Sequence, residues 1–296
     1  MPAPKGVKQS GRGGPPSDII AAVNSPPSLA ERIRTIPWSR LAVPVGAALL
    51  LGIWARLTPQ GLLGKADAIG YAVCHRIDAR SFHLGDRPLP LCSRCTGMYL
   101  GAAISLIGFQ ALGRQGAGKF PTGKMRIGLA IFIAAFLVDS VNSMLQLFPG
   151  LPHLYLPQNE VRLATGLLGG IALGTYVYAA FQQTVWMDWK SEPALARGRD
   201  LAILLGVAGV MYVAVTSENP LLLYPLAIAS GLSVLGLLTV VFGVLTLTLT
   251  HRENQVTRWR GLALPFAGGL ALALVQIGGL DLIRFALTGT WGGFTL

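Results

Sequence analysis

Long apolar runs separated by short polar connections make up this chain from about residue 41 onward. A helix needs about 20 residues to cross a hydrocarbon layer about 30 Å thick. Runs that reach or approach this length are predicted at 41–57, 94–113, 125–147, 160–186, 200–218, 220–250 and 262–287. The segment 66–74 is too short to span and is predicted to form a re-entrant or interfacial turn. The pattern therefore predicts an all-α polytopic membrane protein with a bundle of about seven transmembrane helices.

The composition agrees with this fold class. Hydrophobic residues make up 52% of the 296 residues and charged residues only 12%, whereas a soluble domain has about 25% charged residues. The net charge of +11 does not indicate a nucleic-acid-binding protein, because the basic residues lie at the ends of apolar runs and not on a polar domain with stacking aromatics.

The first 40 residues differ from the rest of the chain. They are rich in proline, glycine, serine and basic residues and lack apolar periodicity, so we predict a disordered, basic cytoplasmic tail. The first apolar run begins too late for a normal signal peptide, and no cleavage pattern follows it. The predicted organisation is a tail at 1–40 and a transmembrane helical domain at 41–296, with a loop rich in cysteine, histidine and arginine at 58–93.

The distribution of basic residues predicts the orientation. The connections after the second, fourth and sixth runs hold Arg114, Lys119, Lys124, Arg126, Lys190, Arg197, Arg199, Arg252, Arg258 and Arg260. The connections after the third and fifth runs, and the residues beyond the seventh, hold none. Because short basic connections stay on the cytoplasmic side, we predict a multi-pass cell-membrane protein with a cytoplasmic N-terminus. The cysteine loop and the C-terminus are then extracytoplasmic.

All three cysteines of the chain lie within this loop or directly after it, and one of the four histidines of the chain follows Cys74. Three thiolates and one imidazole suit tetrahedral zinc, and a Cys-x2-Cys pair is the usual chelating half of such a site. We therefore predict zinc as a cofactor, and either His83 or His153 is an alternative fourth ligand. The predicted metal ligands are Cys74, His75, Cys92 and Cys95.

The loop also carries basic residues on the translocated side, which indicates a local role for them. Guanidinium groups bind phosphate and carboxylate in a bidentate manner, so an anion or a lipid head group, phosphorylated or otherwise anionic, is the predicted partner. Asp139 is predicted to face the bundle and to pair with Arg162, and ion pairs that merely fold the loop are the alternative. The predicted anion- or lipid-binding residues are Arg76, Arg80, Arg94, Asp139 and Arg162.

Besides an arginine site in which the cysteines only staple the loop, two alternatives to this function stay open. In the first, Cys92 and Cys95 form a redox disulfide at a helix N-terminus, with Cys74 as a resolving thiol. The protein would then be a membrane thiol-disulfide oxidoreductase linked to quinone, although the odd cysteine leaves the relay incomplete. In the second, the protein is a non-catalytic accessory subunit of a membrane complex. The residues predict a binding site and do not choose between binding and catalysis.

Small residues and one further charged pair predict how the helices pack. Glycines recur at four-residue spacing in two runs, as Gly97 and Gly101 and as Gly166, Gly170 and Gly174. Such ridges allow two helix backbones to approach closely. Asp281 and Arg284, near the outer end of the last run, are predicted to hold helices together.

Three segments resemble a known family: Cys74-His75, Arg80-Ser81-Phe82 and Pro90-Leu91-Cys92-Ser93-Arg94-Cys95-Thr96-Gly97. They are similar to the signature CH…RSF…PLCxRCTG of a family of bacterial and archaeal polytopic membrane proteins, a domain of unknown function. Asp139 and the run 162–166 resemble the second polar block of that family. The resemblance covers about 71–174, roughly a third of the chain. It implies a shared site built from these residues and brings no activity with it.

Overall fold

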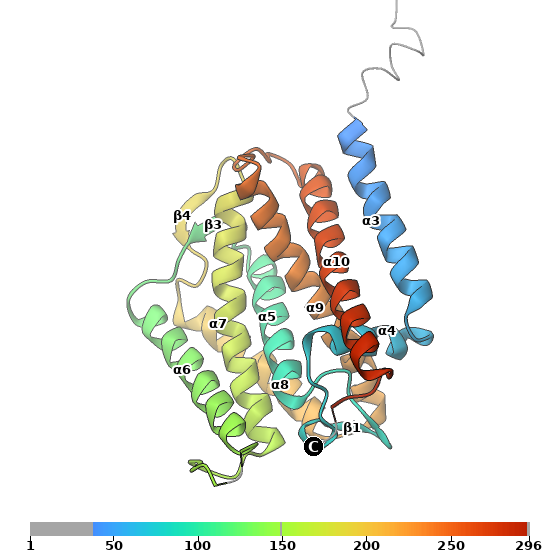
Figure 1. Ribbon diagram of the computed structural model, residues 1–296. Coiled ribbons are helices and arrows are strands. Elements are labelled where there is room, and N and C mark those ends of the chain that lie inside the picture. Colours follow the sequence, from blue (N-terminus) through green and yellow to red (C-terminus); the bar gives the residue numbers. More distant parts are fainter. Residues whose placement is uncertain (1–37, 149, 295–296) are drawn as a thin grey trace, which may run out of the picture. The chain divides into compact units, whose positions relative to one another are not determined.

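Helices carry most of the chain in this computed structural model, which describes residues 38–148 and 150–294. The helices in this part of the chain are α3 (Trp38–Leu57), α4 (Gly61–Val73), α5 (Ser93–Ala111), α6 (Gly123–Leu145), α7 (Asn159–Val185), α8 (Gly198–Thr216), α9 (Pro220–Leu249) and α10 (Ala263–Thr288). Figure 1 shows the long helices running side by side. The predicted all-α class is confirmed, whereas the tail predicted at 1–40 lies, up to residue 37, outside the described residues.

The described residues from Ala42 onward form one compact unit. Six of the seven predicted runs coincide with helices, and their ends agree within two residues. The first run, predicted to begin at residue 41, lies within α3, which begins at Trp38. Helix ends were therefore predicted well, because a break in apolar composition marks each of them.

The number of predicted spans was in part wrong. Five helical segments are long and apolar enough to cross a membrane, and a sixth is obtained if α3 and α4 count as one broken span. Helix α5 is not among them, because polar residues such as Arg94, Thr96 and Ser105 lower its hydropathy. Ser105 is fully buried and donates to the carbonyl oxygen of Ile171 in α7, 3.0 Å away. A helix face covered by protein does not need an apolar surface.

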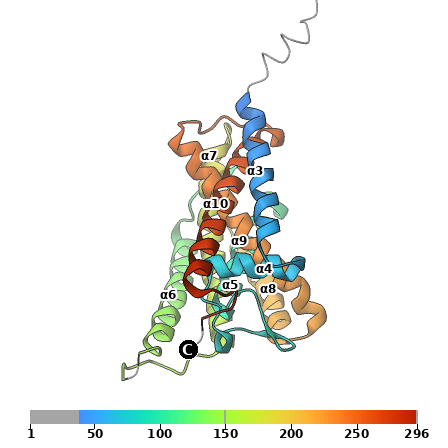
Figure 2. The ribbon, with the colours of Figure 1, turned by 45° about the vertical axis from the view of Figure 1, so that its right-hand side comes forward.

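The prediction of a loop over 58–93 was in part wrong, because helix α4 occupies 61–73. It turns from α3 by 103° at a short break, and Figure 2 shows it crossing the direction of α3. The ammonium group of Lys65 in α4 donates to the carbonyl and hydroxyl oxygens of Thr58, each 3.0 Å away. It thus caps the end of α3. The predicted turn at 66–74 falls within α4 and at its end, and the bend itself fits either a broken span or a re-entrant loop.

The predicted glycine ridges bring α5 and α7 into backbone contact. A methyl group placed on Gly170 would lie 2.1 Å from the carbonyl oxygen of Met98, and one on Gly101 would lie 2.3 Å from that of Leu167. Neither position has room for a Cβ atom. The close approach fixes the rotation of the two helices, and with it the direction of the polar residues at the start of each.

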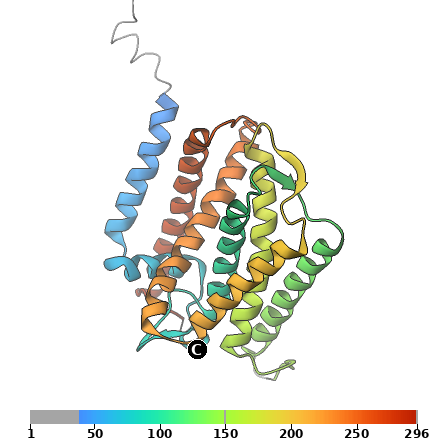
Figure 3. The same ribbon diagram turned by 180° about the vertical axis from the view of Figure 1, so that it is seen from behind.

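The basic connections meet at one end of the unit. Strand β3 (Ala117–Lys119) pairs in parallel with β4 (Lys190–Pro193), and Met187 donates to the carbonyl oxygen of Val256 at 3.0 Å. The hairpin of β1 (His83–Leu84) and β2 (Arg87–Pro88) lies away from them, near the start of α5. Figure 3 shows the same separation from behind. The cysteine loop and the basic connections therefore lie at opposite ends of the bundle.

Candidate functional site

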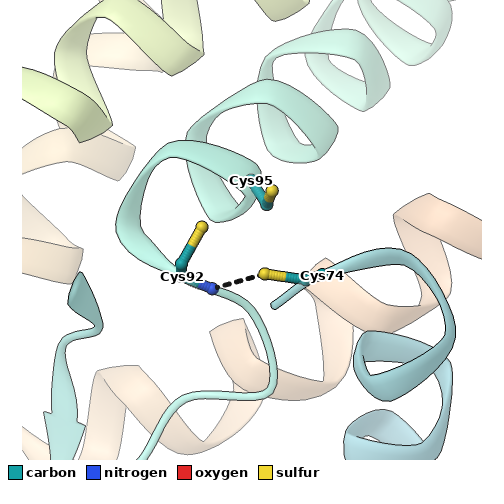
Figure 4. A group of neighbouring side chains, drawn as sticks. All are labelled: Cys74, Cys92 and Cys95. Atoms are coloured by element: carbon teal, nitrogen blue, oxygen red, sulfur yellow. Dashed lines mark hydrogen bonds between the residues drawn. The ribbon is translucent and has the colours of Figure 1, made fainter. Parts of the chain in front are cut away.

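The three cysteines come together where α4 ends and α5 begins. Cys74 follows the last residue of α4, Cys92 precedes the first residue of α5, and Cys95 lies in the first turn of α5. Their sulfur atoms all lie within 4.8 Å of one another, and the three thiols are free. Figure 4 shows the side chains converging. The predicted grouping of the three cysteines is thus present in the folded protein.

Backbone amides point at the sulfur of Cys74. The amide of Cys92 donates to this sulfur at 3.3 Å, and the amide of Arg76 does so at 3.5 Å. The second contact depends on a left-handed backbone at Arg76, where φ is 52°. Hydrogen bonds from the Cys92 and Cys95 thiols and from these amides lower the pKa of Cys74. Donors of this kind stabilise a thiolate, the form of cysteine that binds metals and reacts.

Two features outside the motif hold Cys74 in place. Gly70 allows the approach of the segment before Cys92, since a Cβ atom there would lie 1.9 Å from the carbonyl oxygen of Pro90. Arg284 in α10 donates to the carbonyl oxygens of Tyr71 and Cys74, each at 2.6 Å. Its charge therefore lies at the carbonyl end of α4, where a cation is favourable.

The sequence motif did not reveal this role of Arg284. Asp281, one turn earlier in α10, accepts a hydrogen bond from the indole of Trp54 in α3 at 3.1 Å. The two residues do hold helices together as predicted, but each does so with a different partner and not by pairing with the other. Only their position in the last apolar run indicated that they would be satisfied inside the protein.

His75 is half-buried and stands apart from the sulfur group in this arrangement. Its Nδ1 atom accepts a hydrogen bond from the amide of Ile77 at 3.0 Å, which leaves the ring proton on Nε2. Burial lowers the pKa of His75 and so favours this neutral form. The alternatives lie elsewhere: His83 contacts Asp78 at 3.1 Å, and His153 is exposed.

Three arginines converge on Ser143 of α6. Arg80 donates to the carbonyl oxygen of Ser143 at 3.2 Å, while Arg94 and Arg162 donate to its hydroxyl at 2.7 and 3.3 Å. These arginines come from a 3-10 turn (Asp78–Arg80), from the first turn of α5 and from the first turn of α7. Ser143 is fully buried. We call Arg80, Arg94, Arg162 and Asp139 the arginine cluster.

Asp139 is the carboxylate of this cluster, and its predicted partner was wrong. The ion pair forms with Arg94, whose Nη2 and Nε atoms lie 2.6 and 3.0 Å from Oδ2. Tyr155 donates to Oδ1 at 2.6 Å and Thr165 to Oδ2 at 3.3 Å. Arg162 instead donates to Asn159 at 2.9 Å. The spacing along one helix could not show which arginine of a neighbouring helix would reach Asp139.

Charge in the arginine cluster is unbalanced. Arg80 is 8% exposed and Arg162 is 5% exposed, and neither forms an ion pair with a carboxylate in the described part of the chain. Burial and the nearby charge of Arg94 lower the pKa of Arg80. Buried cations are costly unless an opposite charge compensates them. The cluster thus holds three guanidinium groups and one carboxylate.

Arg76 does not join the cluster. Its guanidinium contacts Asp67 of α4 at 2.9 Å and donates to the carbonyl oxygen of Trp291 at 3.1 Å. Asp67 also pairs with Arg87. The alternative of loop-folding ion pairs is therefore realised for Arg76 and Arg87, and not for Arg80 and Arg162.

Tyr155 and Asn142 were not predicted as site residues. Asn142 of α6 accepts a hydrogen bond from the amide of Leu154 at 2.6 Å and donates to the carbonyl oxygen of Tyr155 at 3.0 Å. It thereby places the phenol of Tyr155 over Asp139. The polar face of α6 was visible in the sequence, but the loop that covers it has no motif.

Comparison with known proteins supplies the family of the chain. Residues 74–176 match the family described as "Predicted membrane protein (DUF2085)". An uncharacterized protein of Methanothermobacter thermautotrophicus is 31% identical over 102 residues, which cover 34% of this chain and 80% of the relative. The chain belongs to this family. An uncharacterized protein of Methanocaldococcus jannaschii is 24% identical over 123 residues, 42% of this chain and 72% of the relative.

The region matched by the DUF2085 family contains the three cysteines and the whole arginine cluster, from Cys74 to beyond Thr165. Helices α8, α9 and α10 lie outside it. No solved structure matches the chain significantly. The resemblance predicted from the cysteine and arginine motifs is therefore confirmed. The three cysteines and the arginine cluster both lie within the region that the DUF2085 family model matches.

Proposed function

We propose that this integral membrane protein carries an extracytoplasmic zinc centre beside a binding site for an anionic or phosphorylated lipid head group. The convergence of the three cysteine sulfur atoms is the observation that carries the first part of this proposal. Two buried arginines that have no carboxylate partner among the described residues carry the second part.

The donor set favours zinc among the metals available to proteins. Thiolates are soft ligands, and three of them together select zinc, copper(I) or an iron–sulfur cluster over magnesium or calcium. Backbone amides that donate to Cys74 also stabilise its negative charge. Cys92 and Cys95 supply the chelating pair at the start of α5, where the helix dipole favours an anion.

The fourth ligand is proposed to be His75 or a small molecule from outside the protein. For His75 to bind zinc through Nε2, the hydrogen bond that Nδ1 accepts from Ile77 would have to break, so that the ring proton can move to Nδ1. If His75 keeps its present contact, the metal retains one open position, as catalytic zinc sites do. The site then has the coordination that Lewis-acid chemistry requires.

The proposed orientation depends on the two ends of the bundle. Basic connections gathered at the β3–β4 end are retained in the cytoplasm by the positive-inside rule, with α5 as a protein-covered crossing. The cysteines and the arginine cluster, at the opposite end, then face the outer leaflet. A phosphate from a lipid head group there would meet the unused donors of Arg80 and Arg162.

The metal is tested first, by elemental mass spectrometry of the purified protein in detergent. We expect about one zinc per chain, which should be lost in Cys92→Ala because a chelating thiolate is removed. His83→Ala and His153→Ala are matched controls, since these histidines lie away from the sulfur atoms. Loss of zinc in His75→Ala but not in the controls would identify His75 as the fourth ligand.

A thiol count under denaturing, non-reducing conditions separates the zinc centre from the redox alternative. Three free thiols after chelation would support the metal site, in keeping with the three free cysteines of the folded chain. One free thiol and no metal would overturn it and would favour a disulfide between Cys92 and Cys95. That result would make the thiol-disulfide oxidoreductase the better proposal.

Lipid binding is tested with nanodiscs or vesicles that differ in one anionic lipid. Arg80→Gln and Arg162→Gln should each weaken binding of phosphatidylglycerol by about tenfold, the loss expected for a charge-assisted hydrogen bond. Arg87→Gln is the control, because Arg87 is 43% exposed and pairs with Asp67. Equal binding by all variants, or equal binding of a zwitterionic lipid, would contradict the proposed head-group site. Inorganic phosphate as a competitor distinguishes a free anion from a lipid.

A further inference from the structure

A second candidate site lies on α3 and α10, apart from the arginine cluster. An apolar groove of about 450 Å³ is lined by residues of both helices and by Trp291. Six of its lining residues are leucine, isoleucine or valine, and three are aromatic: Trp54, Phe285 and Trp291. Such a groove accepts a hydrophobic molecule from the membrane.

Two polar side chains, Thr58 and Asp281, lie in this apolar lining, and the hydroxyl of Thr58 donates to the carbonyl oxygen of Trp54 at 2.8 Å. Asp281 is 4% exposed, and its Oδ2 atom accepts the hydrogen bond from the indole of Trp54. Its Oδ1 atom is buried, and no donor in the described part of the chain contacts it. Arg284 does not compensate it by an ion pair, because its guanidinium donates to carbonyl oxygens at the end of α4. A buried acceptor without a partner is costly and points to a missing donor.

We propose that the groove binds a lipid-soluble quinol, whose hydroxyl donates to Oδ1 of Asp281. A quinol combines the features that the lining calls for: a hydroxyl donor, an aromatic ring and a long apolar chain. Trp54 and Trp291 are aromatic residues of the lining against which the ring would pack, and the aliphatic residues of α3 and α10 would contact the chain. This inference is independent of the zinc centre and of the arginine cluster, and it concerns binding alone.

The groove and the cysteines also share one packed hydrophobic core. Trp54 and Leu274, which line it, belong to the same packed core as Cys74 and Cys92. Trp291 packs against that core, and its carbonyl oxygen accepts from Arg76. A ligand in the groove would therefore contact side chains of the packed core that includes Cys74 and Cys92.

The test is a titration of the purified full-length protein with decylubiquinol under anaerobic conditions, followed by tryptophan fluorescence and calorimetry. We expect saturable binding that Asp281→Leu weakens by about tenfold, since the hydrogen bond to Oδ1 is lost. The dimethyl ether of the same quinol lacks the donor and should bind the unaltered protein as weakly as the quinol binds Asp281→Leu.

A second variant keeps the test decisive if Asp281→Leu fails to fold. Gly278 lines the groove, and a Cβ atom there would lie 3.8 Å from Trp54, an ordinary contact. Gly278→Leu should therefore fill the groove and abolish binding without touching Asp281. Gly236→Leu is the matched control, because that glycine lies on α9 with open space around its Cβ position.

Three outcomes would overturn the proposal. The first is equal affinity for the quinol and its dimethyl ether, which would show that Asp281 accepts no hydrogen bond from the ligand. The second is unchanged binding in Gly278→Leu, which would place the quinol elsewhere. The third is equal displacement by decane, which would show that the groove is filled by any acyl chain.

Discussion

Asp139 and Asp281 are both buried carboxylates in long apolar helices, yet their surroundings differ. Asp139 is 1% exposed and accepts hydrogen bonds from Arg94, Tyr155 and Thr165. Asp281 is 4% exposed and accepts one hydrogen bond, from Trp54. Burial alone therefore does not indicate a ligand-binding residue. The number of donors decides whether a carboxylate holds the fold or is available to another molecule.

The difference follows from where each residue lies. Asp139 is on α6, facing the first turns of α5 and α7, and the loop after α6 folds back over it. Asp281 is on α10 and faces α3 along this side. Both carboxylate oxygens of Asp139 thus accept hydrogen bonds from neighbouring elements, whereas Asp281 lies in the interface between two helices.

The largest expected effect is that of Asp139→Asn. Removing this charge leaves three guanidinium groups together without a carboxylate, which should cost about 3–5 kcal/mol, as for other broken buried ion pairs. The apparent midpoint of thermal unfolding in detergent should fall by on the order of 10 °C.

The double variant Arg94→Met with Asp139→Leu sharpens this test. Because both charges of the pair are removed together, it should be more stable than Asp139→Asn. A midpoint of Asp139→Asn within the error of the unaltered protein would contradict the structural role given to Asp139.

A smaller effect is expected for Tyr155→Phe, about 1 kcal/mol for one hydrogen bond. Burial and the hydrogen bond to Asp139 raise the pKa of Tyr155 from 10.0 to about 12. The folded protein thus favours the neutral phenol, so its stabilisation is complete below pH 10.0 and is lost as the pH rises toward 12. Midpoints measured across this range should converge for the two proteins. A constant difference at every pH would show that the hydroxyl of Tyr155 does not donate to Asp139.

The smallest effect on stability is expected for Asp281→Asn, below about 1 kcal/mol, because an amide oxygen can still accept from Trp54. The same thermal unfolding assay measures it beside Asp139→Asn. If the two asparagine variants lost equal stability, the inferred difference between Asp139 and Asp281 would be wrong. That difference is that both oxygens of Asp139 accept hydrogen bonds, whereas Oδ1 of Asp281 has no donor in the described part of the chain.

Much of the candidate site was predictable because it is local in the sequence. The Cys-x2-Cys pair at the start of a helix places Cys92 and Cys95 close together in any fold, and the polar spacing on α6 puts Asp139 and Ser143 on one face. The grouping of Cys74 with this pair was also predicted. Its cause, the bend between α3 and α4 and the approach at Gly70, was not.

The sequence by itself determined the long helices and their ends, the glycine ridges and the separation of basic connections from the cysteine loop, but not helix α4. Each of these depends on composition or on a short period along the chain. Only the tertiary structure decided that Arg94 and not Arg162 pairs with Asp139, that Arg284 caps α4, and that Trp54 reaches Asp281. These contacts join different helices, and the rotation and register of packed helices set them. A shift of one residue would turn each side chain by about 100°.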